Sequence, residues 1–284
     1  RALGITYAMP LWARLRLNRE EPIEENVYLG DIPKMIGGGE FIVNGAERII
    51  VTQLQRSPGV DFSSETHTSG KKLFVCRVIP EYGSWLQIET SSKDELQLRI
   101  DSSNKLPFSM FMRCFNPDVS TNEDLIDLFY ETKSVSLGSK KNQRAIQRRR
   151  AAEDIVNEET GEFIVEAGDP LKDKVDELLE AGVKKVKVVV SVDDALMLNT
   201  IRVDEAKNYE EAVNKLYMKL RMTVPPNLEK AEELFNERFN NFERFSFGAI
   251  GRFRINREFG QIAPDDEYRL TFDDLLNIAR KIVS

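Results

Sequence analysis

The stretch that decides the fold runs from Glu40 to Val60 and reads EFIVNGAERIIVTQLQRSPGV. Its first apolar run, Phe41–Val43, leads into Asn44-Gly45, and a second apolar run extends from Arg48 to Leu54. Asn-Gly supplies the positive backbone angles that a two-residue hairpin turn needs, so the stretch predicts two paired strands. Ser57-Pro58-Gly59 ends the second strand, because proline cannot donate a backbone hydrogen bond and glycine favours a break.

The patterns on either side of this hairpin divide the chain into a strand-rich first part and a helix-rich last part. Alternating apolar residues predict strands at residues 5–17, 26–35, 72–79, 85–89, 96–100 and 184–192. Helical spacing predicts helices at residues 124–130, 171–179, 209–220, 227–241 and 271–282, with capping boxes at 120–123 and 271–274. This order indicates an α+β fold: a mixed β-sheet and hairpin segment, then an α/β body with helices concentrated in the C-terminal third.

Composition and charge exclude several classes of protein. The 284 residues are 41% hydrophobic, enough for one large domain or two, and no apolar run approaches the ~18 residues of a membrane span. Two cysteines, Cys76 and Cys114, indicate no disulfide framework and favour a reducing compartment. A net charge of −7 argues against non-specific coating of nucleic acid. The chain starts at Arg1, which indicates a processed product or part of a longer protein.

One strongly basic run stands against this acidic background. Residues 140–150 read KKNQRAIQRRR, and the next thirty residues hold eleven acids against two lysines. Three interpretations stay open: the run binds phosphate, it is a solvated charge run, or it is a helix that faces the acidic stretch.

The residues alone indicate no catalytic or metal-binding chemistry. The sequence has neither a nucleophile elbow nor a phosphate-binding Gly-Lys-Ser/Thr loop. Its single histidine, His67, lies in a Ser/Thr-rich turn, with no partner at a recognisable spacing. The acid pairs at 193–194 and 265–266 are adjacent residues, which rarely point the same way and so make poor chelators.

From Gly39 to Val60 the sequence closely resembles the β subunit of bacterial multisubunit RNA polymerase. The archaeal and eukaryotic counterparts share the core Phe-Ile-x-Asn-Gly-x-Glu, and the ending Gln-Leu-x-Arg-Ser-Pro-Gly-Val points to the bacterial version. Further segments that resemble the family follow in order: ITYAMPLWARLRL, VYLGDIPKM, VIPEYGSWLQIE, LRIDSSNKLP, TIRVD, RMTVPPN and FGAIGRFRIN. The resemblance covers residues 1–115 and 155–260, whereas residues 130–152 resemble the family only weakly, and we carry no function onto them.

The resemblance implies a partial subunit that is not catalytic alone. Residues 1–55 would be the first part of the protrusion, 56–252 the lobe, and 253–284 the return toward the protrusion. In the complete enzyme the chain is expected to form a wall of the main cleft, beside downstream DNA, the non-template strand and nascent RNA. Its expected partners are the β′, α and σ subunits of the complete enzyme. No cofactor is expected in this chain, because another subunit of the complete enzyme would hold the catalytic Mg²⁺. The expected location is the cytoplasm, at the bacterial nucleoid, with no membrane partner.

The resemblance also implies a pocket for an unstacked base of the non-template strand. The family's pocket positions correspond here to Arg56, Trp85, Asp101 and Arg202. A tryptophan face can stack on a base, a carboxylate can accept from a guanine edge, and arginine can pair with a base or a phosphate. Ser246 departs from the family, which commonly has an aspartate there, so the base preference of this pocket is left open.

Two further sites are implied in the N-terminal part. Arg48, Val51 and Gln53 match positions beside the family's rifamycin pocket and the path of nascent RNA, and Val51 is expected to be a core residue of that wall. No rifamycin affinity is expected, because the pocket's other wall lies downstream of this chain.

Pro22, Ile23 and Glu24 align with an edge that the transcription-repair coupling factor and CarD-type regulators use in the family. Such an edge can bind a partner strand through backbone hydrogen bonds, although Pro22 has no N–H to offer. An acidic loop is the alternative interpretation of these residues. For the whole chain the alternative is a stand-alone protein-interaction module that binds transcription factors without nucleic acid, and no motif supports a free-standing enzyme.

Overall fold

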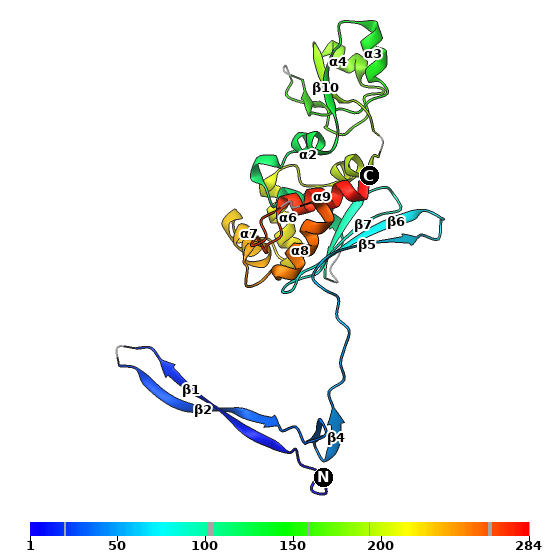
Figure 1. The fold of residues 1–284 in the computed structure, drawn as a ribbon. Helices are drawn as coiled ribbons and strands as arrows, with labels where there is room; N and C mark the ends of the chain where they lie inside the picture. Colours follow the sequence, from blue (N-terminus) through cyan, green and yellow to red (C-terminus); the bar gives the residue numbers. More distant parts are fainter. Residues whose placement is uncertain (20, 102–104, 158–159, 193, 261–262, 284) are drawn as a thin grey trace. The chain divides into compact units, whose positions relative to one another are not determined.

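The computed structural model describes residues 1–19, 21–101, 105–157, 160–192, 194–260 and 263–283. Asp193, one of the paired acids, lies outside them. The chain forms two compact units, Arg1–Gln55 and Arg56–Ser284 (Figure 1). The boundary falls inside the opening stretch, immediately before the Ser57-Pro58-Gly59 break.

The first unit consists of two antiparallel ribbons. β1 (Ala8–Leu17) pairs with β2 (Ile23–Pro33), and β3 (Glu40–Val43) pairs with β4 (Ala46–Ile49). The ribbons are joined by backbone bonds such as that from the Tyr7 N–H to the Ile42 carbonyl, 3.0 Å. The Asn-Gly hairpin is confirmed, because Asn44 and Gly45 have φ values of 50° and 80°. The second strand is shorter than predicted: residues 50–57 have no strand partner and are extended without secondary structure.

The second unit is built on a five-stranded antiparallel sheet. Its strands follow chain order: β5 (Gly59–Thr66), β6 (Lys72–Ile79), β7 (Leu86–Thr90), β8 (Leu96–Ile100) and β9 (Leu106–Pro107). Alternate residues of β7 and β8 are buried, as the period-two pattern predicts for a sheet with one covered face. The strands predicted at 72–79, 85–89 and 96–100 are therefore confirmed.

Helices cover the buried face of this sheet and share one core with it. They are α1 (Phe108–Arg113), α2 (Asn122–Phe129), α5 (Leu196–Val203), α6 (Tyr209–Arg221), α7 (Leu228–Phe235), α8 (Gly248–Phe259) and α9 (Phe272–Val283), with a short 3₁₀ turn at Pro117–Val119. A π-helical turn, Asn236–Asn240, extends α7. The contacts of α9 include β6, and the expected return of residues 253–284 toward the protrusion stays a prediction.

Residues 131–190 form an insert with a separate core (Figure 1). β10 (Thr132–Ser136) pairs with β13 (Lys185–Val189), and a second small ribbon joins β11 (Ile155–Val156) to β12 (Phe163–Val165). Two short helices, α3 (Lys140–Ile146) and α4 (Val175–Glu180), complete it. Its buried residues include Leu137, Ile146, Val186 and Val188.

The α+β class is confirmed, with antiparallel sheets in the N-terminal part and helices mostly in the C-terminal part. The capping box at Thr271 and Asp274 is confirmed, whereas the one predicted at residues 120–123 is shifted by one residue, to Thr121 and Asp124. No helix was predicted at residues 248–259, because the buried side of α8 carries Gly251, Arg252 and Asn256 and so lacks an apolar stripe.

Candidate nucleic-acid interface

Three of the four residues predicted for the base pocket lie at one end of the five-stranded sheet. Arg56 comes three residues before β5, Trp85 directly before β7, and Asp101 directly after β8. The strand register brings these ends together through the pairs Gly59–Ile79, Val78–Leu86 and Leu86–Ile100. Antiparallel pairing in chain order therefore places residues that are distant in sequence at the same end of the sheet.

Trp85 and Asp101 are locked to each other by two hydrogen bonds. The Trp85 N–H donates to the Asp101 carboxylate at 2.9 Å, and the Asp101 N–H donates to the Trp85 carbonyl at 2.8 Å. Asp101 has a φ of +53°, which a non-glycine residue seldom adopts without such support. Trp85 as a whole remains 43% exposed, so its backbone is fixed while the residue stays accessible.

Arg56 lies at the start of a loop that packs against α8. Its guanidinium forms an ion pair with Asp61. The carbonyls of the next two residues, Ser57 and Pro58, accept hydrogen bonds from Arg254, at 3.0 and 2.9 Å. Gly251 permits this close packing, because a Cβ there would lie 3.0 Å from the Cβ of Pro58. The loop that carries Arg56 is therefore anchored in the second unit.

A hollow of ≈ 380 Å³ adjoins this sheet end, and three arginines line it: Arg221, Arg238 and Arg244. Gly83 and Ser84, just before Trp85, line it from the sheet side. Arg238 connects the hollow to the pocket residues, since its Nη2 donates to the Ser84 hydroxyl at 3.0 Å and to the Asp101 carboxylate at 3.3 Å. The volume is within the range of ligand sites, ≈ 300–1,000 Å³.

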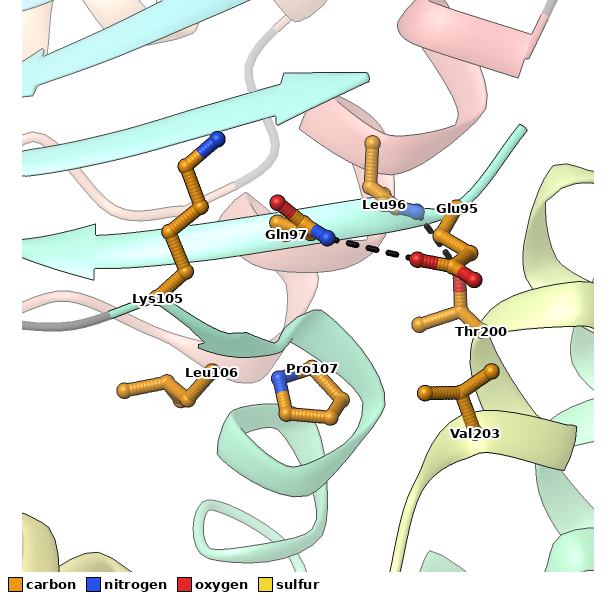
Figure 2. Close-up of a pocket in the computed structure, with 8 residues that line it drawn as sticks. All are labelled: Glu95, Leu96, Gln97, Lys105, Leu106, Pro107, Thr200 and Val203. Atoms are coloured by element: carbon orange, nitrogen blue, oxygen red, sulfur yellow. Dashed lines mark hydrogen bonds between the residues drawn. The ribbon is translucent and has the colours of Figure 1, made fainter. Parts of the chain in front are cut away.

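Arg202 lies elsewhere. It is an exposed residue of α5, which contacts the opposite end of β8, where the Leu96 N–H donates to the Thr200 hydroxyl at 2.7 Å (Figure 2). Because β8 rises by ~3.3 Å per residue, its two ends lie on the order of 15 Å apart. The structure thus brings Arg56, Trp85 and Asp101 to one end of the sheet and leaves Arg202 near the opposite end.

Thr200 and Val203 of α5 line a second, smaller cavity of ≈ 170 Å³ (Figure 2). Its lining combines the polar side chains of Glu95, Gln97 and Lys105 with the apolar side chains of Leu106, Pro107 and Val203. The volume is well below that of usual ligand pockets, so it is the weaker candidate site.

Ser246, the position that departs from the family pattern, is 2% exposed. Its backbone pairs with Tyr82, and its hydroxyl accepts from the Gly248 N–H at 3.2 Å. The side chain is therefore turned into the start of α8 and forms part of the turn structure.

The residues predicted for the RNA-side wall belong to the first unit and are all exposed. Arg48 is on β4 opposite Phe41, and Val51 and Gln53 follow on the extended segment. Val51 is 72% exposed, so its expected place in a core is wrong for this chain. The reason is that residues 50–57 pair with no strand, which leaves their side chains without a packing surface.

The predicted regulator edge begins β2. Ile23 pairs with Leu17, Glu24 pairs with Arg16, and the Glu24 carboxylate accepts from Arg14 Nη2 at 2.8 Å. Pro22 precedes the strand. The alternative of an acidic loop is wrong at Ile23 and Glu24, which are in a strand. Within the described part of the chain, β2 pairs only with β1, so its other edge is open.

A family model named RNA polymerase Rpb2, domain 2, matches residues 183–284. Over the whole chain, the DNA-directed RNA polymerase subunit beta of Rhodopirellula baltica is 44% identical, and those of Flavobacterium psychrophilum and Bacteroides thetaiotaomicron are 33% and 32% identical over 99% of the chain. The chain belongs to the bacterial RNA polymerase β-subunit family. It spans 23–24% of the length of these relatives.

The match to domain 2 of this family begins inside the insert and includes the three cavity arginines. The sequence analysis did not predict these three arginines. Each is on or after a helix, and the apolar pattern of a helix predicts its buried side but not which polar residues on the other side meet. Among the residues placed by the structure, no group of three His, Cys, Asp or Glu side chains could hold a metal ion. No described helix is both long and apolar enough to cross a membrane.

Proposed function

We propose that the chain forms part of the wall of the main cleft in bacterial RNA polymerase and takes an unstacked base of the non-template DNA strand beside Trp85. The observation that carries this proposal is the pairing of an accessible indole with a fixed carboxylate. Trp85 offers a face for stacking, and Asp101 offers an acceptor held by the backbone of its neighbour. The stacking ring of Trp85 and the acceptor carboxylate of Asp101 are thus adjacent at one end of the sheet.

Arginines supply the complementary charge for the strand's phosphates. Arg221, Arg238 and Arg244 line the hollow next to Trp85 together with Glu237, and Arg56 lies at the same sheet end. Arg238, Arg244 and Arg56 form ion pairs with Asp101, Glu237 and Asp61, so a phosphate would share or replace these partners. Guanidinium groups bind phosphate oxygens in a fork geometry, so a strand whose base stacks on Trp85 would find cations on its backbone side. Arg202 has no part in this version of the pocket, and Arg221 takes its place.

The activity of the complete enzyme is part of the same proposal. RNA synthesis is assigned to the whole polymerase, with this chain beside the β′, α and σ subunits, downstream DNA and nascent RNA. The Mg²⁺ of the complete enzyme is assigned to another subunit, and the described residues offer no three-ligand cluster for it. The chain's own residues bind and orient the separated strand.

Trp85→Ala in the reconstituted polymerase tests the pocket. Base stacking contributes ~1–3 kcal/mol, so photocrosslinking of a non-template base near the downstream edge of the bubble should weaken roughly 5- to 150-fold. Trp12→Ala is the matched control, because Trp12 is the chain's other tryptophan and is 58% exposed in the first unit. Unchanged crosslinking in Trp85→Ala would remove this residue from the site.

A second function is favoured by the open edge of β2. We infer that this edge binds a strand of a regulator, of the kind represented by the transcription-repair coupling factor and CarD-type proteins. Replacing Ile23 with aspartate should weaken capture of such a regulator by the polymerase, while leaving non-template crosslinking unchanged. If capture is unaffected, the edge is not the docking surface; if the polymerase binds regulators but no bubble template, the chain is an interaction module instead.

A further inference from the structure

Three exposed cations lie on α3, and a fourth lies just beyond its end. Asn142 and Gln143 point back toward the body of the insert, where they donate to the carbonyls of Ser136 and Leu137 at 2.9 and 2.7 Å, and Ile146 is fully buried. Residues on the remaining side are exposed, and four of them are Lys140, Lys141, Arg144 and Arg148. We call these four the α3 basic face. Lys140 and Arg144 are one helical turn apart, with Arg148 just beyond the helix end.

No carboxylate neutralises the α3 basic face in the described structure. Four acids of the acidic stretch have other partners: Glu153 accepts from the Lys187 N–H, Asp154 from the Ala167 N–H, Glu166 pairs with Lys207 and Glu177 with Lys174. Ion pairs therefore do not support a helix that faces the acidic stretch, and a solvated charge run and a phosphate-binding run are the interpretations that stay open. The four cations of the face take part in no ion pair with any residue that the structure places.

This concentration of charge comes from folding and not from composition. Residues 131–190 contain twelve lysines and arginines and twelve acids, so the insert has no formal net charge. Packing of Asn142, Gln143 and Ile146 against the insert nevertheless leaves four nearby cations exposed. Like charges held together repel one another, and an unneutralised group of this kind is stabilised by a polyanion.

We propose that the α3 basic face binds the phosphodiester backbone of duplex DNA. The proposal rests on the placement of the chain beside DNA argued above. Residues 140–150 contain no aromatic side chain, whereas proteins that bind single strands typically stack bases on aromatic rings. The face can contact phosphates but cannot stack bases, so it fits a duplex, and its contacts carry no sequence preference.

The test uses the complete polymerase with a full-length β subunit carrying Lys140→Gln and Arg144→Gln. Binding to a bubble template with a long downstream duplex is measured as a function of salt concentration. Each lost phosphate contact reduces the slope of log K against log salt by ~0.9, so the double variant should lower it by about 2. Lys133→Gln with Lys172→Gln is the matched control, since both lysines are exposed in the same insert, outside the face.

The expected result is a lower slope in the α3 double variant alone, only on the long template, and no difference on a template cut at the bubble edge. Equal changes in both double variants, no change in either, or an equal loss on the cut template would each overturn the proposal. Lys140→Arg should bind like the parent enzyme, because the charge is kept. Trp85→Ala reports on the strand pocket separately, so a failure of that pocket and a failure of the α3 basic face give different results.

Discussion

Arg252 has no exposed surface, and its guanidinium donates four hydrogen bonds. Its Nη1 and Nη2 donate to the two carboxylate oxygens of Asp274 at 2.7 and 2.9 Å, and it also donates to the carbonyls of Glu267 and Arg269. Asp274 in turn caps α9 by accepting from the Thr271 N–H. One buried carboxylate thus holds α8, the loop after it and the start of α9.

Asp274→Asn should therefore be strongly destabilising. Breaking one side of a buried ion pair leaves an uncompensated charge and typically costs ~3–5 kcal/mol. Asp273→Asn is the control, because the Asp273 carboxylate is exposed in the same helical turn. This substitution should cost less than ~1 kcal/mol. Urea unfolding of the two variants measures the difference, and similar free energies of unfolding would show that the pair does not matter for stability.

Gly83→Ala should disturb the base pocket through a clash and not only through backbone strain. Gly83 has a φ of +120°, and an added Cβ would lie 2.8 Å from the Arg244 carbonyl and 2.9 Å from the ring of Phe245. Gly70, with a φ of +84°, has no atom within 4 Å of such a Cβ. Gly70→Ala should thus cost about 1 kcal/mol, and Gly83→Ala clearly more, in thermal unfolding.

At the scale of the elements, the sheet carries a carboxylate whose titration affects stability. Burial raises the pKa of Glu89 on β7, but hydrogen bonds from Lys105 and Gln87 and the charges of Lys105 and Arg99 outweigh it, so its pKa is below the ordinary 4.5. The unfolded chain then binds the proton more readily than the folded one. The stabilisation is present above pH ~4.5 and is lost as the pH falls through the lower folded pKa.

Glu89→Gln should remove that part of the acid sensitivity. The free energy of unfolding, measured in urea between pH 3 and pH 6, should fall less steeply with acid in the variant than in the parent chain. Glu65→Gln is the control, because Glu65 is mostly exposed and its ion pair with Arg77 is long, at 3.7 Å. An unchanged acid profile in Glu89→Gln would contradict the role given to this carboxylate.

Local signals explain which elements the sequence predicts. Asn44-Gly45 fixes its hairpin and Thr271 its helix start, because both depend on neighbours within four residues. The proposed base pocket depends instead on strand register and on α8, whose buried side includes polar residues. Local periodicity in the sequence predicts neither feature. Arg56, Trp85 and Asp101 were predicted for the pocket from the resemblance, whereas the place of Arg221 beside the hollow required the packed structure.

At the scale of the whole molecule, the two units differ in how much they bury. No described residue of Arg1–Gln55 is buried, and apolar side chains of its long ribbon, such as Leu15 and Ile23, are more than half exposed. A two-stranded ribbon is marginally stable in water unless a further layer covers it. The second unit has two cores of its own.

Amide hydrogen exchange on the isolated 284-residue chain should therefore divide at the boundary. Amides of β1–β4 should exchange within the range of local fraying, whereas those of β6–β8 should be protected up to the global stability. Chains cut to residues 56–284 should retain the protection of β6–β8. Strong protection in β1–β2 would show that the ribbon is stable without a covering surface.

The π-helical turn at Asn236–Asn240 holds one residue more per turn than the α-helix it continues. It leaves Phe235 and Phe239 in the core while Arg238 reaches Asp101. Removing one residue there would rotate one flank of the helix against the other by about 100°. A single-residue gap at this turn in an alignment or a designed variant therefore predicts a changed position of Arg238 relative to Asp101, and not only a shorter loop.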